Sequence, residues 1–299
     1  MRWKPVAVLL LCLALGSCWI AERTIIYRPA RDGGNVDPAG WGLPAQPEQI
    51  ETPDGIRLAA WWIPQNDPNA PAMILFQGRR GLRHWYGWQT RSLYERGVSL
   101  MIFQYRGYAG SEGHPTEEGL IRDGTAVYDW VRTRVGDRPI ILYGRSLGGA
   151  VAAQTALRRS AQGLVLESTF TSMPDVARAV TGVPGIGFVV VTQFDTLAAV
   201  ERLDVPLMIV HGTEDNLVPF EMGQSLFEAS ASHRKAFHPV EGARHWNAYS
   251  MAGNRYDRWF DALLENVRLY VAAPELHARS VSGPTIPDQA KTTVPVRVN

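Results

Sequence analysis

Residues 140–149 are IILYGRSLGG, and this short stretch decides the fold. Its first four residues form an apolar run typical of a buried strand, and the small residues that follow Gly149 favour a helix. Between them lies the pattern G-x-S-x-G, centred on Ser146. Between a strand and a helix, this pattern predicts a tight turn that holds the serine in a strained conformation above the sheet. Ser146 is therefore the candidate nucleophile, and the alternative is a Gly-Ser turn without chemistry.

Further apolar runs alternate with helical patterns on both sides of this stretch. Strands that are apolar on both faces, and that helices separate, belong in a parallel sheet covered on both sides. Upstream, two strand-like stretches flank Pro53-Asp54-Gly55, a strong hairpin signal. The sequence predicts an α/β fold with a mostly parallel sheet, an N-terminal antiparallel hairpin and a short lid between Thr169 and Asp204. The apolar runs are residues 72–76, 98–103, 140–143, 164–166 and 206–210, and helices are expected over 120–135 and 259–271.

Charge and composition exclude one class of function. The chain has 299 residues with 30 Lys+Arg against 29 Asp+Glu, a net charge of +1. Neutralising nucleic-acid phosphates requires a clustered excess of positive charge, so we expect no nucleic-acid partner. We expect an N-terminal segment over residues 1–21, one domain over 22–275 and a disordered tail over 276–299, which is rich in Pro, Thr and Ser.

Both cysteines, Cys12 and Cys18, lie in the N-terminal segment. The rest of the chain therefore has no cysteine for a disulfide, a thiolate zinc site or nucleophilic catalysis. No metal or organic cofactor is expected.

The N-terminal segment has the pattern of an export signal. Arg2 and Lys4 precede an uncharged apolar stretch over residues 5–21. Within it, Leu15-Gly16-Ser17-Cys18 resembles the bacterial lipobox, which makes Cys18 the lipidation candidate. An uncleaved membrane anchor and plain secretion are the alternatives. We expect an exported, membrane-associated protein of a bacterial cell envelope.

A serine at neutral pH is a weak nucleophile, so it needs a histidine base that an acid orients. After a G-x-S-x-G serine, the acid and then the histidine follow along the chain. The run over 206–210 leads into a loop with Asp215, and a strand-like stretch over 235–240 leads into a loop with His245. We therefore predict that Ser146, Asp215 and His245 form the catalytic triad.

Other residues compete for these roles. Glu214 and Glu167 are alternative acids, and Asp215 has an alternative role as the cap of a helix that begins near Pro219. His245 has the alternative of a surface histidine without chemistry. His211 stands at the end of a strand, which favours a structural role.

An acyl-transfer site also needs two backbone N–H groups that bind the developing oxyanion. The residue after the nucleophile, Leu147, is expected to supply one. The loop after the run over 72–76, Gln77-Gly78-Arg79-Arg80-Gly81, is expected to supply the other through the backbone of Arg79. A plain turn is the alternative for this loop.

Four stretches together resemble serine hydrolases of the α/β-hydrolase fold: residues 105–113, the turn at Ser146, residues 167–172, and residues 211–219 with His245. The resemblance is to a branch of small, often membrane-anchored proteins that includes acyl-protein thioesterases and bacterial esterases and is related to prolyl-oligopeptidase-like peptidases. That family usually has His-Gly-Asn at the oxyanion loop and Asp before Tyr-Arg-Gly. This chain has Gln77-Gly78-Arg79 and Gln104 instead.

This resemblance implies a serine hydrolase that cleaves carboxylic esters or thioesters through an acyl-enzyme on Ser146, with a small-molecule or lipid-like acyl substrate and a membrane bound through the N-terminus. A prolyl-oligopeptidase-like peptidase, an acyl transferase and a binding scaffold without turnover are the alternatives. The apolar segment over 180–191 either accepts an acyl chain or packs against the sheet as a buried helix. Four arginines are expected at the mouth of the site, where they favour an anionic ester or membrane unless nearby acids pair with them: Arg79, Arg80, Arg83 and Arg145.

Overall fold

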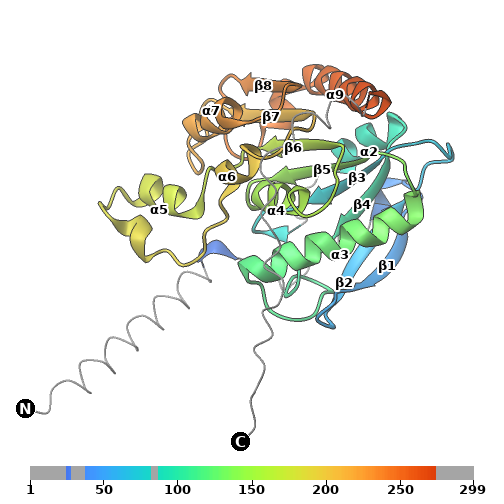
Figure 1. The fold of residues 1–299 in the computed structure, drawn as a ribbon, viewed down its shortest axis with the longest axis horizontal. Coiled ribbons are helices and arrows are strands. Elements are labelled where there is room, and N and C mark those ends of the chain that lie inside the picture. The colour runs from blue at the N-terminus through green and yellow to red at the C-terminus, as the bar shows by residue number, and fades with distance from the viewer. Residues whose placement is uncertain (1–24, 28–37, 82–86, 274–299) are drawn as a thin grey trace, which may run out of the picture.

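The computed structural model describes residues 25–27, 38–81 and 87–273. Within these residues, eight strands form one sheet (Figure 1). The strands are β1 (Gln46–Glu51), β2 (Arg57–Ile63), β3 (Ala72–Phe76), β4 (Ser99–Phe103), β5 (Ile140–Arg145), β6 (Gly163–Glu167), β7 (Leu207–Gly212) and β8 (Lys235–Val240). Their order in the sheet is β1-β2-β4-β3-β5-β6-β7-β8. The β1–β2 and β2–β4 pairs are antiparallel, and all other neighbours are parallel, which confirms the predicted fold.

Helices cover both faces of this sheet. The longer ones are α2 (Gly87–Glu95), α3 (Glu117–Val135), α4 (Leu147–Ala156), α5 (Met173–Thr181), α7 (Phe220–Ala229) and α9 (Asn254–Ala272), and the shorter ones are η1 (Pro38–Trp41), η3 (Ile186–Val189), α6 (Thr196–Val200) and α8 (Ala248–Ala252). The helices α3, α4, α6 and α7 pack on one face, and α2, α8 and α9 pack on the other.

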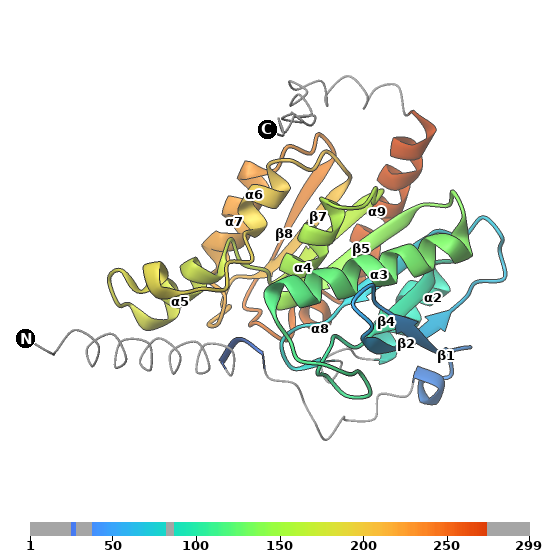
Figure 2. The same cartoon turned by 60° about the horizontal axis from the view of Figure 1, so that its bottom comes forward.

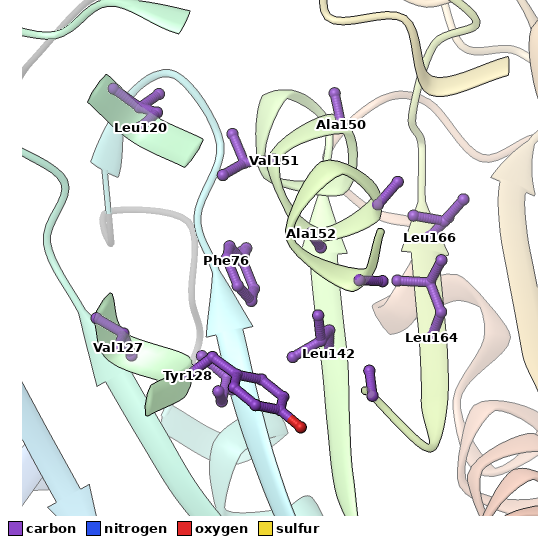
Figure 3. Close-up of a cluster of buried hydrophobic side chains, with 14 of the residues drawn as sticks. Phe76, Leu120, Val127, Tyr128, Leu142, Ala150, Val151, Ala152, Leu164 and Leu166 are labelled. Atoms are coloured by element: carbon purple, nitrogen blue, oxygen red, sulfur yellow. The ribbon is translucent and has the colours of Figure 1, made fainter. Parts of the chain in front are cut away.

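The side chains of the central strands alternate between two buried clusters. In β3, Ile74 and Phe76 face α3 and α4, whereas Met73 and Leu75 face α2 and α9. Figure 3 shows the first cluster, in which Phe76 and Leu142 lie opposite Val151. Every residue of β3 and β5 is buried, which explains why these strands are apolar without alternation.

The lid, residues 169–204, contains α5, η3 and α6, and α5 projects away from the sheet (Figure 2). Only Met173 of α5 is buried, and Val180, Val183, Phe188, Val189 and Val191 are exposed. The alternative of a buried helix against the sheet is therefore wrong, because most of the large apolar side chains of this segment are exposed, although Val190 packs against the core.

The N-terminal segment with Cys12 and Cys18, as well as Arg83 and the tail over 276–299, lie outside the described residues. Among the helices that the structure describes, none combines the length and the apolar character needed to span a membrane.

Candidate active site

The turn between β5 and α4 holds Ser146 in a conformation that L-residues rarely adopt, with φ 53° and ψ −122°. Two glycines allow close contacts between backbone segments at this turn. A Cβ on Gly144 would lie 2.3 Å from the backbone oxygen of Gly148, and a Cβ on Gly148 would lie 2.0 Å from the backbone oxygen of Phe76. The Ser146 N–H donates to the backbone oxygen of Glu167 at 2.9 Å, which fixes the turn to β6.

Ser146, His245 and Asp215 form one chain of hydrogen bonds. The distance from Ser146 Oγ to His245 Nε2 is 3.0 Å, and the distance from His245 Nδ1 to Asp215 Oδ2 is 2.7 Å. A carboxylate only accepts, so Nδ1 carries the proton and Nε2 is left to accept the Ser146 hydroxyl hydrogen. The structure thus brings together the three residues predicted for the triad, in the geometry of a nucleophile, a base and an orienting acid.

The carboxylate of Asp215 is fixed by four groups. Its Oδ1 accepts the backbone N–H groups of Leu217 and Val218, both at 2.9 Å. Its Oδ2 lies 2.7 Å from His245 Nδ1 and 3.4 Å from His211 Nε2. The nitrogen His211 Nε2 also lies 3.0 Å from the backbone oxygen of Val218, which only accepts, so this nitrogen carries its proton toward both oxygens. His211 is structural, as expected, and in addition it holds Asp215.

The two alternative acids do not orient His245. Glu214 is exposed to solvent. Glu167 is buried on the other side of the β5–α4 turn and accepts hydrogen bonds from the Tyr143 and Tyr256 hydroxyls. Asp215 is therefore the acid on His245.

The surroundings of Asp215 and His245 keep the acid ionised and the base neutral. Burial alone would raise the pKa of Asp215, but hydrogen bonds from His211 and His245 outweigh it and hold that pKa below its ordinary value. Burial lowers the pKa of His245, against the opposing influence of its hydrogen bond to Asp215. At neutral pH the pair is thus an ionised carboxylate and a neutral imidazole, the state in which His245 can accept a proton.

The loop after β3 passes beside Ser146. A Cβ on Gly78 would lie 3.7 Å from the Ser146 Cβ. The Tyr108 hydroxyl donates to the Arg79 backbone oxygen at 3.0 Å, and the Arg79 side chain donates from Nη1 to the Ile25 backbone oxygen at 3.1 Å. On the opposite side, Leu147 is the first residue of α4, so its N–H has no partner within the helix. This arrangement suits the predicted oxyanion-binding role of Arg79 and Leu147.

The two departures from the family pattern meet beneath this loop. Gln77 and Gln104 are both buried, and their side-chain oxygens would lie 3.7 and 3.5 Å from a Cβ on Gly81. The two glutamines, which replace the family's usual His and Asp, therefore lie close together beneath the loop. Neither takes part in the hydrogen bonds of Ser146 and His245.

Arg145 lines the site, but its charge is directed into the protein. Its side chain is only 6% exposed, its Nε lies 3.3 Å from Glu167 Oε1, and its Nη2 donates to the His245 backbone oxygen at 3.0 Å. For Arg145 the alternative of pairing with a nearby acid therefore applies. This guanidinium holds the loop of His245 against β6.

Two cavities meet at Ser146, and Ser146 and Arg79 line both. The first is small, and Arg80, Arg145, His245 and Trp246 also line it. It is called the polar cavity below, after its arginine, serine and histidine side chains. The second has a volume of about 140 Å³ and is almost entirely apolar. Its other lining residues are Ile25, Ile26, Leu147, Phe170, Met173, Val176, Val180, Leu217 and Val218.

Comparison with known proteins gives the family. The model for serine aminopeptidase, S33, matches residues 67–189. The alpha/beta hydrolase domain-containing protein WAV2 of Arabidopsis thaliana is 28% identical over 260 residues, which are 79% of this chain and 84% of that protein. An uncharacterised protein of Mycobacterium tuberculosis is 31% identical over 251 residues, which are 82% of this chain and 88% of that protein. The chain belongs to the α/β-hydrolase family.

Other members of the α/β-hydrolase family agree with this assignment. The lysophosphatidylserine lipase ABHD12 of Danio rerio is 28% identical over 235 residues, which are 70% of this chain and 59% of that protein. The esterase Pf2001 of Pyrococcus furiosus has the same fold, with a TM-score of 0.68 at 20% identity over 80% of this chain and 97% of that one. The coarse class that the family supports is a serine hydrolase.

Sequence reasoning missed three groups that shape the site: His211 against Asp215, Tyr108 against the Arg79 backbone, and Ile25 with Ile26 at the apolar cavity. His211 and Tyr108 lie within stretches that carry the family resemblance, so the resemblance could have indicated that both lie near the site. Nothing in the local pattern around Ile25 indicates a place beside Ser146.

Proposed function

We propose that the protein hydrolyses carboxylic esters or thioesters of apolar acyl chains through an acyl-enzyme on Ser146. One observation carries the proposal: the hydrogen-bonded chain of Ser146, His245 and Asp215 opens onto an apolar cavity. An acyl chain in this cavity would present its carbonyl carbon to Ser146 Oγ.

The proposed reaction has two halves. Ser146 Oγ attacks the acyl carbon while His245 Nε2 takes the hydroxyl proton, and the N–H groups of Leu147 and Arg79 bind the oxyanion. The tetrahedral intermediate then breaks its bond to the alcohol or thiol, which leaves with the proton from His245. In the second half, water loses a proton to His245 and attacks the acyl-enzyme, and Ser146 regains its hydrogen when the acid departs.

The polar cavity favours a substrate with an anionic leaving group. Its positive side chains come from Arg79 and Arg80, and the Arg80 guanidinium lies 5.6 Å from the centre of the Trp246 ring, within the range of a cation–π contact. We therefore propose an amphiphilic ester, with its apolar acyl chain in the large cavity and a negative group near Arg80. A lipase among the relatives supports this substrate class.

The description of the matching family model favours one further candidate, a serine aminopeptidase. Such an enzyme needs an acid near the nucleophile to hold the substrate's α-ammonium group. Among the described residues, no aspartate or glutamate lines either cavity, whereas arginines do. The ester proposal therefore fits the charge of this site better.

The test compares p-nitrophenyl esters of increasing chain length with alanine p-nitroanilide on the full chain. We expect kcat/KM to rise from the acetyl to the medium-chain esters and the anilide to remain uncleaved. Val176→Phe fills the apolar cavity, so it should lower the ratio of medium-chain to acetyl kcat/KM about tenfold. Faster cleavage of the anilide than of any ester would overturn the proposal in favour of the peptidase.

A second comparison tests the polar cavity. Arg79→Ala with Arg80→Ala retains the backbone N–H groups but removes the positive side chains. We expect this double variant to lose the preference for an anionic over a neutral ester of equal chain length. An unchanged preference would remove the anionic group from the proposal.

We also propose that the N-terminal segment exports the protein and holds it at a membrane, through lipid on Cys18 or through an uncleaved anchor. The support is the sequence pattern over residues 1–21. Growth of the expressing cells with a clickable palmitate analogue separates the two possibilities. Lipidation predicts that the parent is labelled and that Cys18→Ser is not. An uncleaved anchor predicts that the parent is bound to the membrane but unlabelled. A parent found only in the soluble fraction contradicts both.

A further inference from the structure

Five exposed large apolar side chains of the lid, together with the exposed Ile25, are here called the lid patch: Ile25, Val180, Val183, Phe188, Val189 and Val191. Phe188 is 96% exposed, more than any other large apolar side chain that the structure describes. Over residues 179–194 the sequence has no charged side chain. Large apolar side chains exposed together on one projecting segment mark an interaction site.

Hydrogen bonds hold the base of the lid to the rest of the fold. Glu117, at the start of α3, accepts the backbone N–H groups of Gln193 at 2.7 Å and Phe194 at 2.6 Å. The Met173 N–H donates to the Gln193 backbone oxygen at 2.8 Å, which joins the two ends of the projecting segment. Polar bonds thus hold the base while the apolar tip projects (Figure 1).

The patch continues into the apolar cavity beside Ser146. Ile25 and Val180 are exposed to solvent and also line that cavity. A ligand that enters the cavity beside these two side chains therefore passes along the patch. A phospholipid bilayer fits both the exposed patch and the apolar cavity, because it can cover the patch and supply apolar acyl chains to the cavity.

The order of the chain points to the same partner. Ile25 follows the uncharged apolar stretch over residues 5–21 after only Glu22, Arg23 and Thr24. Three extended residues span about 10 Å at most. If that stretch is held in a membrane, the patch lies within reach of the lipid surface.

We propose that the lid patch inserts into the surface of a phospholipid bilayer and places the mouth of the apolar cavity against the acyl chains. Phe188 and the valines enter the region between headgroups and acyl chains, as the apolar face of an interfacial helix does. The substrate then moves from the bilayer into the cavity without crossing water. Docking is independent of catalysis, but the delivery of substrate rests on the proposed esterase function.

Docking is tested by fluorescence on the full chain in phosphatidylethanolamine and phosphatidylglycerol vesicles, with and without brominated acyl chains. Phe188→Trp adds an indole to the patch, and Leu269→Trp adds one to an exposed site on α9 as the matched control. Subtracting the parent's emission isolates each added indole. We expect bromine to quench the Phe188→Trp signal by about half or more and to leave the Leu269→Trp signal nearly unchanged.

Equal quenching of the two added indoles would overturn docking, because the patch would then face water. A dimer mass for the full chain in vesicle-free detergent, lost in Phe188→Ser with Val191→Ser, would overturn it in favour of a second copy as the partner. If the patch is instead covered by the chain's own N-terminal stretch, the Phe188→Trp signal resists both bromine and a water-soluble quencher, which also contradicts the proposal.

Delivery is tested by rates. We expect Phe188→Ser with Val191→Ser to lower hydrolysis of a long-chain ester held in vesicles about tenfold and to leave hydrolysis of a soluble short-chain ester unchanged. Leu269→Ser with Val271→Ser is the matched control and should change neither. An equal loss on both substrates would contradict delivery. A parent that cleaves neither ester refutes the proposed function, while the quenching experiment still decides docking.

Discussion

Replacing Asp215 by asparagine is expected to disable His245 while preserving the fold. The Asp215 Oδ1 accepts two backbone N–H groups at 2.9 Å, so the amide oxygen of Asp215→Asn will keep that position. The amide NH2 then takes the place of Oδ2, 2.7 Å from His245 Nδ1. Because the NH2 group donates, Nδ1 must accept, and the imidazole proton moves to Nε2.

This tautomer directs an N–H at Ser146 Oγ across the 3.0 Å contact, so no base remains to take the serine proton. The corresponding loss in a serine triad is a factor of about 10⁴ in kcat. At about 1.36 kcal/mol for each factor of ten, this is about 5 kcal/mol of lost transition-state stabilisation.

The assay is kcat/KM toward a p-nitrophenyl ester, with thermal unfolding as the check on the fold. Glu214→Gln is the matched control, because it neutralises an exposed acid beside Asp215. We expect it to retain the parent rate within about twofold. A folded Asp215→Asn variant that loses less than about tenfold would refute the assignment of Asp215 as the orienting acid.

Three further predictions follow from the same geometry. Since burial lowers the pKa of His245 from 6.5, the acid limb of the kcat/KM profile should have its midpoint below that pH, and a midpoint above it would contradict a buried base. Gly148→Ala should abolish soluble expression, because the added Cβ would lie 2.0 Å from a backbone oxygen of β3, whereas Gly40→Ala, with no atom within 4 Å, should express normally. Arg106→Met should lower the free energy of unfolding by about 3 kcal/mol at neutral pH, because it leaves Asp123 buried without its cation. Burial raises the pKa of Asp123 to about 6 even though Arg106 lowers it, so without Arg106 this pKa is higher still. The loss measured by urea unfolding should therefore shrink as the pH falls toward 6, where the variant's carboxyl takes up a proton, and should level off below that value.

The sheet and the central residues of the site follow from local sequence. Strands such as β3 are buried on both faces, so their apolar runs are unbroken and their limits are clear. The turn at Ser146 can also be predicted from nearby residues, because Gly144 and Gly148 occupy positions where a Cβ would clash with the backbone. Asp215 and His245 follow from their order after parallel strands, because the carboxyl ends of such strands meet at one edge.

Three other features depend on contacts between distant parts of the chain. Arg145 pairs with Glu167 and the His245 backbone, and no pattern near residue 145 indicates that its charge is buried. The lid sequence suits a buried helix as well as an exposed one, and its base is held by hydrogen bonds to Glu117, a residue distant in sequence. For the same reason, the place of Ile25 beside Ser146 could not be predicted from its neighbours.

The central claim is that Ser146 is an activated nucleophile, and covalent labelling tests it most directly. The full chain is treated with a fluorophosphonate, and the intact mass is compared with those of Ser146→Ala and His245→Ala. We expect one adduct on the parent, none on Ser146→Ala and much slower labelling of His245→Ala. A folded parent that takes up no adduct, or a Ser146→Ala variant that still takes one up, would contradict the central claim.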